Sequence, residues 1–190
     1  RYQNYRTPEQ EVPDTALSYV WETCMTMGTS WSYVKNDEYK PTSKLIHLLV
    51  DIVAKGGNLL LNIGPGPDGT LSPVAFERLR DIGAWMKVNG DAIYATRAIA
   101  PYKEGDVCYT RGHDGTINAI YLAPDSTSSL PATVSVPSFH PHPGGDVTML
   151  GVAEPLKWEK SGDGCVIQVP ESVRAALPCR YAWSFRFMPE

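Results

Sequence analysis

A short apolar run between two helical patterns constrains this fold most. The run is "GNLLLNIGP", Gly57 to Pro65, and it is typical of a strand that is buried on both faces, as in a parallel sheet. Helical patterns precede and follow it. Because parallel strands need a crossover connection, usually a helix, we expect βα units packed around a parallel sheet.

The two helical patterns carry their own boundary signals. The first has Thr42 or Ser43 as a cap and Gly56 as a stop, with apolar residues at helical spacing at Leu45, Leu48, Leu49 and Ile52. The second has Ser72 as a cap and Pro73 in its first turn, and it ends near Asn89. A further strand is expected within "SYVWETCMTM", residues 18–27, which is rich in β-branched and aromatic residues.

The pattern changes at about Ala98. From there the sequence consists of short alternating segments separated by Gly, Pro, Asp and Ser, and "RGHDGT" is typical of a hairpin turn. The fold class we predict is α/β plus all-β: βα units in residues 1–97, followed by an antiparallel β-sandwich in residues 98–190.

Composition excludes several function classes. The formal net charge of the 190 residues is −4, and Lys and Arg are scattered, so we expect no nucleic-acid partner. The longest apolar run is too short to cross a bilayer, so we expect no membrane span. No basic segment followed by an apolar one is visible at the start, so no targeting signal is expected within these residues.

The potential metal ligands lack the spacing of a metal site. Cys24, Cys108, Cys165 and Cys179 form no CxxC pair, so we expect packed thiols, with a Cys165–Cys179 disulfide as the alternative. His140 and His142 lie in the Pro-rich stretch "SFHPHPGG", which favours an exposed loop. We expect neither a metal nor a cofactor.

Carboxylates occur early in the chain, in "YRTPEQEVP". Proline fixes its own φ and biases the preceding residue toward extended backbone, so this stretch is predicted to be a loop that carries Glu9 and Glu11. From the residues alone, such a loop is solvated surface, a helix start, or half of a catalytic pair.

Three long motifs resemble the α-L-fucosidases of glycoside hydrolase family 29. They are "VWETCMTMGTSWSY", "LVDIVAKGGNLLLNIGPGPDGTL" and "ERLRDIGAWMKVNGDAIYATR", in the order and approximate spacing of that family. The resemblance covers about residues 7–97, and the later "VTMLG" and "LKW" are similar to the C-terminal sandwich of the family.

This resemblance implies the last two strands of a (β/α)8-like barrel with a β-sandwich behind it. It implies hydrolysis of terminal α-L-fucosyl linkages of glycans with retention of configuration. The Asp nucleophile of the family lies on an earlier strand, so the resemblance also implies a partner: an upstream barrel segment or a separate N-terminal chain. The implied location is secreted, periplasmic or lysosomal.

The resemblance also assigns roles to the carboxylates. In the family, the general acid/base lies in a Thr-x-Glu context before the "WE" strand, which Glu9 matches; Glu9 is 13 positions before Glu22. In some members of the family the acid has been assigned to the position of Glu22. Otherwise Glu22 is a structural acid that orients neighbouring groups by hydrogen bonds. Glu11 is the third candidate for the acid. Retaining hydrolysis needs two carboxylates about 5 to 5.5 Å apart, one to attack and one to protonate the leaving oxygen.

Three further residues are candidates for binding the sugar. Trp31 occupies the position where the family places an aromatic ring against the sugar, and a flat apolar face suits the C5 methyl group of a 6-deoxy sugar. Trp21 is equally consistent with a core residue. Asn62, at the end of the apolar strand, is a polar candidate at the rim of the barrel.

Two other functions remain open on the sequence. The sandwich could be a carbohydrate-binding or interaction module with the barrel strands as scaffold, although alternation buries most of its aromatic residues. The chain could also belong to another retaining glycosidase on the same fold.

Overall fold

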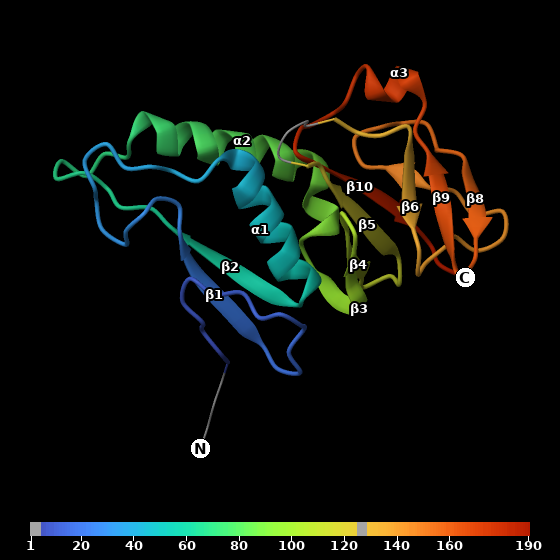
Figure 1. The fold of residues 1–190 in the computed structure, drawn as a ribbon, viewed down its shortest axis with the longest axis horizontal. Helices are drawn as coiled ribbons and strands as arrows, with labels where there is room; N and C mark the ends of the chain where they lie inside the picture. The colour runs from blue at the N-terminus through green and yellow to red at the C-terminus, as the bar shows by residue number, and fades with distance from the viewer. Residues whose placement is uncertain (1–4, 125–128) are drawn as a thin grey trace.

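The first half of the chain forms two βα units, as predicted. The computed structural model describes residues 5–124 and 129–190. Its first elements are β1 (Trp21–Thr26), α1 (Thr42–Ala54), β2 (Gly57–Asn62) and α2 (Pro73–Asn89). Strands β1 and β2 pair in parallel, and both helices lie on the same side of them (Figure 1).

The two helices begin differently from each other. The Ser72 hydroxyl accepts a hydrogen bond from the amide of Ala75 at 3.2 Å, so the predicted cap of α2 is confirmed. The prediction for α1 was wrong, because its N-cap is Pro41, which makes no side-chain cap bond. Thr42 instead donates its hydroxyl to Asp81 of α2 at 3.1 Å. This polar contact ties the two helices together.

The segment predicted to be a loop at residues 6–10 pairs with β1. Its Arg6 and Glu9 form parallel bridges to Trp21 and Cys24. The amide of Cys24 donates to the carbonyl of Pro8 at 3.0 Å, and the amide of Gln10 donates to the carbonyl of Cys24 at 2.9 Å. The segment is irregular apart from these two isolated bridges, so the predicted loop is found, and its backbone bonds place it beside β1, on the side opposite β2.

The two faces of the parallel strands have different surroundings. Met27, Leu61 and Ile63 pack with residues of the helix layer, among them Leu45 and Ala75. Because side chains alternate along a strand, the next residues point to the other face. That face carries Glu22, Cys24, Thr26, Asn58, Leu60 and Asn62.

The second half forms two antiparallel sheets, as predicted, with strand orders β3-β4-β5-β10-β7 and β6-β9-β8. The strands are β3 (Thr96–Glu104), β4 (Val107–Gly112), β5 (Ile117–Leu122), β6 (Thr133–Val136), β7 (Thr148–Met149), β8 (Trp158–Ser161), β9 (Gly164–Gln168) and β10 (Ala182–Phe187). A 3-10 turn, η1 (Gly90–Ala92), precedes β3, and a short helix, α3 (Glu171–Arg174), precedes β10. The β4–β5 hairpin turns where "RGHDGT" predicted it, with the amide of Gly112 bonded to the carbonyl of Thr116 at 2.9 Å.

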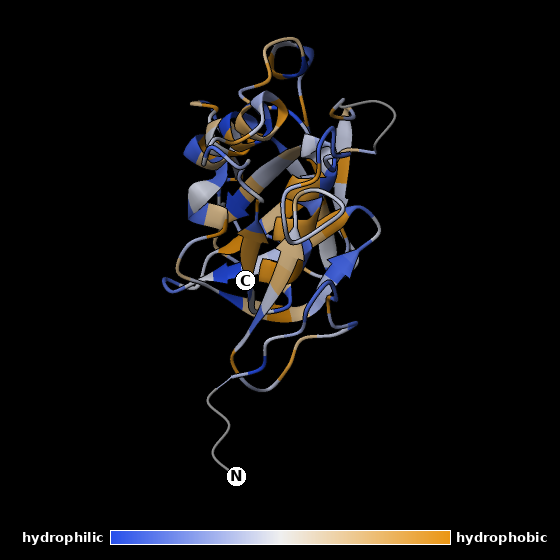
Figure 2. Cartoon of the chain, turned by 90° about the vertical axis from the view of Figure 1, so that its left-hand side faces the viewer, coloured by the Kyte–Doolittle hydropathy of each residue, from blue (hydrophilic) through white to orange (hydrophobic). Residues whose placement is uncertain are grey.

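The two antiparallel sheets enclose an apolar core. Tyr109, Trp183 and Phe185 of the larger sheet are fully buried against Val134 and Ile167 of the smaller one. Across the whole chain, hydrophobic residues lie mainly toward the middle of the molecule and hydrophilic ones mainly at its periphery (Figure 2). The prediction that alternation buries most of the sandwich aromatics holds for Tyr109 and Trp183, which are fully buried; the other four are only half-buried, namely Tyr102, Tyr121, Trp158 and Tyr181.

A second core joins the helices to the larger antiparallel sheet. Ile46 and Val50 of α1 and Trp85 of α2 pack against Cys108 and Ile120 of that sheet. Helix α1 therefore lies between the parallel strands and the larger antiparallel sheet, and α2 runs alongside α1 (Figure 1). Residues on either side of position 97 share this core.

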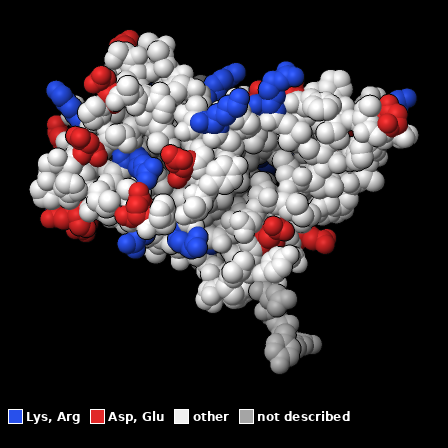
Figure 3. Space-filling model, turned by 180° about the vertical axis from the view of Figure 1, so that it is seen from behind, with Lys and Arg blue, Asp and Glu red and all other residues white. Residues whose placement is uncertain are grey.

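The surface has mixed charge. Lys and Arg are interspersed with Asp and Glu on the face shown in Figure 3, where neither sign forms a continuous patch. Within residues 5–124 and 129–190, no helix is both long and apolar enough to cross a membrane.

All four cysteines are free thiols, so the structure has no Cys165–Cys179 disulfide. Burial raises the pKa of Cys108 to about 12 and that of Cys165 to about 11. A thiol with such a pKa stays protonated near neutral pH, and the thiolate is the reactive form. Both side chains should therefore be inert in the folded protein.

We expect Cys108 and Cys165 to resist alkylation by iodoacetamide at pH 8 and to react when the protein is unfolded without reductant. Peptide mass spectrometry of the two samples measures this. If Cys165 and Cys179 stayed unlabelled in denaturant until a reductant was added, they would be joined by a disulfide and the free-thiol assignment would be wrong.

Candidate functional site

Three backbone segments end together at one edge of the parallel strands. They are residues 6–10, β1 and β2, which run in the same direction. In barrels built from βα units, the carboxyl ends of the strands carry the binding and catalytic groups. The candidate site is therefore this edge, which we call the rim.

Glu9 lies on the face of the strands that points away from the helices. It pairs with Cys24, and residues in register in a sheet project to the same face. The side chain is exposed. The backbone around Glu9 is held on both sides, because the hydroxyl of Thr23 donates to the carbonyls of Pro8 at 3.2 Å and Glu11 at 2.6 Å. Glu9 is thus a carboxylate on a firmly held segment.

Glu22 occupies the same face at a different height. It precedes Cys24 by two residues, which is about 7 Å along a strand, and it is half-buried. Glu22 is therefore further from the rim than Glu9. Glu11 is exposed and lies beyond the paired residues, where the chain leaves β1.

Trp21 lies at the end of β1 opposite the rim. Its side chain is completely buried, and its indole N–H donates to the carbonyl of Lys55 at 3.3 Å. The ring lies against Gly57, where an added Cβ would be 2.4 Å from the ring atoms. Of the two roles that the sequence left open for Trp21, sugar contact and core residue, a fully enclosed ring at the far end of the strand favours the core residue.

Trp31 has the opposite environment. It lies in the connection between β1 and α1, on the rim side, and 40% of its surface is exposed. In the sequence Val20 precedes Trp21, whereas Trp31 lies between Ser30 and Ser32, but neither setting indicates how deeply the ring is buried. The structure distinguishes them: Trp21 is buried at the start of β1, and Trp31 is exposed beyond its end.

Asn62 is the last residue of β2 and is opposite Thr26 of β1. Its main-chain carbonyl accepts the amide of Met27 at 2.9 Å. Its side-chain oxygen is enclosed and has no hydrogen-bond partner among the described residues. Buried acceptors are usually hydrogen-bonded to a donor. Asn62 therefore remains a candidate for a polar contact at the rim.

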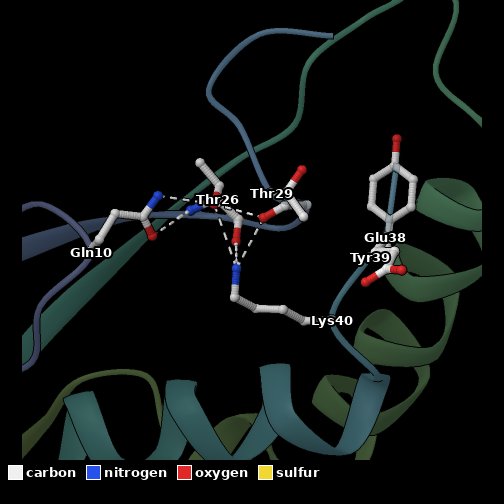
Figure 4. A pocket seen from close by; sticks show the side chains of 7 residues that line it. Gln10, Thr26, Thr29, Glu38, Tyr39 and Lys40 are labelled. Carbon is white, nitrogen blue, oxygen red and sulfur yellow. Dashed lines mark hydrogen bonds between the residues drawn. The ribbon is translucent and has the colours of Figure 1, made fainter. Parts of the chain in front are cut away.

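An open pocket of about 600 Å³ lies beside the end of β1. Lys40 crosses it and donates its ammonium group to the carbonyls of Thr26 at 2.5 Å and Gly28 at 3.1 Å (Figure 4). The amide group of Gln10 donates to the hydroxyl of Thr26 at 2.9 Å. Burial, followed by the nearby charge of Lys44, lowers the pKa of Lys40.

Sequence reasoning missed Lys40 and its contacts. The residue stands in a polar connection before α1 and belongs to no motif. Its role depends on main-chain oxygens of a strand more than ten residues earlier. Only the position of that strand relative to α1 reveals it.

His140 and His142 are the two histidines that we predicted to lie on an exposed loop without forming a metal site. His140 approaches a carboxylate oxygen of Glu190 at 3.3 Å, and His142 bonds the carbonyl of Pro143 at 3.1 Å. Within the described parts of the chain, no group of three or more His, Cys, Asp or Glu residues is arranged to hold a metal ion.

Family comparisons cover nearly the whole chain. The family model described as Alpha-L-fucosidase matches residues 1–91, and the model of the Alpha-L-fucosidase C-terminal domain matches residues 101–188. An alpha-L-fucosidase of Branchiostoma floridae is 40% identical over 190 residues, which are 96% of this chain and 41% of that protein. The plasma alpha-L-fucosidase of Homo sapiens is 34% identical, over 95% of this chain and 40% of that protein.

Solved structures have the same fold. The Thermotoga maritima alpha-fucosidase in complex with a mechanism based inhibitor superimposes with a TM-score of 0.80 at 28% identity, over 97% of this chain and 43% of that one. An alpha-L-fucosidase isoenzyme of Paenibacillus thiaminolyticus gives a TM-score of 0.81 at 24% identity, over 98% of this chain and 45% of that one. The chain thus spans about two fifths of the length of its relatives, and the predicted fold class is confirmed.

Proposed function

This chain belongs to the α-L-fucosidase family, and we propose that it is the C-terminal part of an enzyme that hydrolyses terminal α-L-fucosyl linkages of glycans with retention of configuration. One observation carries this proposal: the pairing of residues 6–10 with β1 holds Glu9 on the face away from the helices, near the rim where Trp31 is exposed. This arrangement suits a proton donor beside a sugar site.

In the proposed mechanism Glu9 is the general acid/base. It protonates the glycosidic oxygen as the bond to the sugar breaks and then takes a proton from the water that releases the sugar. Glu22 remains the alternative acid and otherwise supports neighbouring groups on the same face. Trp31 packs against the apolar side of the fucose, and Asn62 offers its side-chain oxygen to a donor at the rim.

The nucleophile of this mechanism is an aspartate on an upstream barrel segment or a separate N-terminal chain. Exposed apolar side chains support such a partner. Leu60 on the open face of β2 and Phe76 on α2 are each 52% exposed, and Leu79, one turn along α2, is 36% exposed. In the described residues β2 pairs only with β1, so its other edge is available to a further strand.

We also propose a division into a barrel portion, residues 1–97, and a sandwich domain, residues 98–190. The limits of the two family models, 1–91 and 101–188, support this division. Relatives named plasma and tissue alpha-L-fucosidases support a secreted, periplasmic or lysosomal location.

The test compares this chain with the same chain joined to its upstream segment. Only the joined protein should hydrolyse 4-nitrophenyl α-L-fucoside, and proton NMR should show α-L-fucose as the first product. Aryl galactosides, glucosides and xylosides should be turned over far more slowly.

Three outcomes would contradict the proposal. Turnover by residues 1–190 alone would mean that the nucleophile lies within this chain, and β-L-fucose as the first product would exclude retention. Faster hydrolysis of another aryl glycoside would assign the fold to a different glycosidase.

A further inference from the structure

The connection between β1 and α1 is a loop whose ends are tied together. We call residues 28–40 the rim loop. At its base, the backbone amide of Lys40 donates to the carbonyl of Met27 at 2.9 Å. The ammonium group of Lys40 reaches the carbonyls of Thr26 and Gly28 (Figure 4). The two ends of the loop therefore meet at one lysine.

A second tie lies one step into the loop. The carboxylate of Asp37 accepts the hydroxyl of Thr29 at 2.5 Å and its amide at 3.2 Å. The carboxylate packs onto Gly28, where an added Cβ would overlap it. The hydrogen bond from the Thr29 hydroxyl is the main cause of the lowered pKa of Asp37, so this acceptor remains ionised at neutral pH.

The middle of the rim loop rests on the end of the neighbouring strand. A Cβ added to Gly64, two residues after β2, would lie 2.6 Å from the carbonyl carbon of Ser32 and from the nitrogen of Tyr33. The backbone on the C-terminal side of Trp31 therefore touches the chain that leaves β2. Trp31 is held between this contact and the tied base.

We propose that Lys40 is a positioning residue that holds the rim loop closed and thereby fixes Trp31 for binding the fucosyl group. This inference rests on the proposed function. Lys40 does not act on the substrate directly, since its ammonium group is occupied by the main-chain oxygens of Thr26 and Gly28. A bond between a charged donor and a carbonyl is stronger than a neutral one, and it offsets the entropy of closing a loop of this length.

Asp37 also holds the rim loop closed, through its hydrogen bonds with Thr29. With the loop closed, the Trp31 ring is presented in one orientation, so little binding energy is lost in ordering it. With the loop open, the same ring is present but must be ordered by the sugar. Replacing Lys40 or Asp37 should therefore weaken binding of the fucosyl group, and should do so only when Trp31 is present.

The experiment uses the complete enzyme and the variants Lys40→Met, Trp31→Ala and the double variant. Lys40→Met should raise the KM for 4-nitrophenyl α-L-fucoside and the inhibition constant of L-fucose by about tenfold, the scale of one aromatic contact. The value of kcat should change by less than about threefold, as expected when uniform binding is lost. Adding Lys40→Met to Trp31→Ala should cause no further loss, because coupled residues are not additive.

Lys35→Met is the matched control. Lys35 belongs to the same loop, is exposed, and makes no hydrogen bond within the described residues; its variant should behave like the parent enzyme. Asp37→Asn is a second variant that keeps the side-chain shape, and it should show the same rise in KM and the same dependence on Trp31.

The outcomes separate this inference from the proposed function. A parent enzyme that does not hydrolyse the fucoside would overturn the proposed function itself. An active parent whose KM is unchanged by Lys40→Met, or a double variant with the full sum of both losses, would overturn the positioning role alone. If the Lys40→Met protein fails to fold, Asp37→Asn provides the test instead. An unchanged KM for Asp37→Asn would then also overturn the positioning role.

Discussion

Replacing Glu9 by alanine in the complete enzyme should slow hydrolysis of a fucosyl disaccharide by about 10²–10⁴-fold, the usual contribution of a general acid. The loss on 4-nitrophenyl α-L-fucoside should be much smaller in the bond-breaking step, because this leaving group departs without a proton. Steady-state and pre-steady-state rates on both substrates measure the difference.

The physical reason lies in how Glu9 is held. Its backbone is part of a ladder with β1, and the Thr23 hydroxyl bonds the carbonyls on either side of it. A rigid backbone limits the positions that the carboxylate can reach, and well-oriented groups contribute strongly to catalysis. Removing the carboxylate should therefore leave binding largely intact while the proton donor is lost.

Added azide provides the second half of this test. In the variant, the fucosyl-enzyme intermediate lacks a base to activate water, but azide attacks without one. Azide should restore turnover of the nitrophenyl substrate and yield a fucosyl azide, detectable by mass spectrometry.

Two other carboxylates serve as comparisons. Glu11→Ala, two residues further along the exposed loop, should change the rates by no more than about threefold. If Glu22→Ala instead showed the leaving-group dependence and the azide rescue while Glu9→Ala did not, the acid would be Glu22. Equal losses on both substrates for Glu9→Ala would also count against its assignment.

Replacing Trp85 by alanine should lower the free energy of unfolding by about 3–5 kcal/mol, the range for a large buried aromatic residue. Only 2% of Trp85 is exposed, and its indole N–H donates to the carbonyl of Ala182 in β10 at 2.9 Å. The ring belongs to the core that joins α1 and α2 to the larger antiparallel sheet. Its loss leaves a cavity at that junction, and the carbonyl of Ala182 keeps only the weak thiol donor of Cys179 at 3.3 Å.

Denaturant unfolding of the complete enzyme, followed by circular dichroism, measures this change. Trp85→Phe should keep most of the packing but lose the indole hydrogen bond, which leaves the carbonyl of Ala182 to the thiol of Cys179, at a cost of about 1 kcal/mol. Trp31→Ala is the matched control, because Trp31 is exposed and its loss should change stability by no more than about 0.5 kcal/mol. Similar effects of Trp85→Ala and Trp31→Ala would show that the junction core contributes little.

Much of the local structure was predictable because it depends on neighbours in the sequence. The cap at Ser72 and the hairpin at residues 111–116 follow from short-range hydrogen bonds and turn preferences. The apolar run at residues 57–65 predicted a strand, and β2 lies within it; of the two faces expected to be buried, one packs on the helices while Leu60 on the other is 52% exposed.

The candidate site was less predictable. The roles of Glu9 and Trp31 came from resemblance to a family, while their residue types alone allowed several readings. Trp21 was placed among the binding candidates because composition cannot indicate depth, and it proved to be buried at the opposite end of β1. Lys40 was overlooked because its partners are main-chain oxygens, which leave no trace in residue identity.

Hydrophobic periodicity and turn residues thus specify the helices, the strands and the change from α/β to all-β, since each depends on residues within about ten positions. The pairing of residues 6–10 with β1, the burial of Trp21 and the closure of the rim loop by Lys40 arise differently. They depend on backbone groups and free volume that come together only when distant segments pack. For this reason the list of candidate residues could be written from the sequence, whereas their arrangement at one edge of the strands required the folded chain.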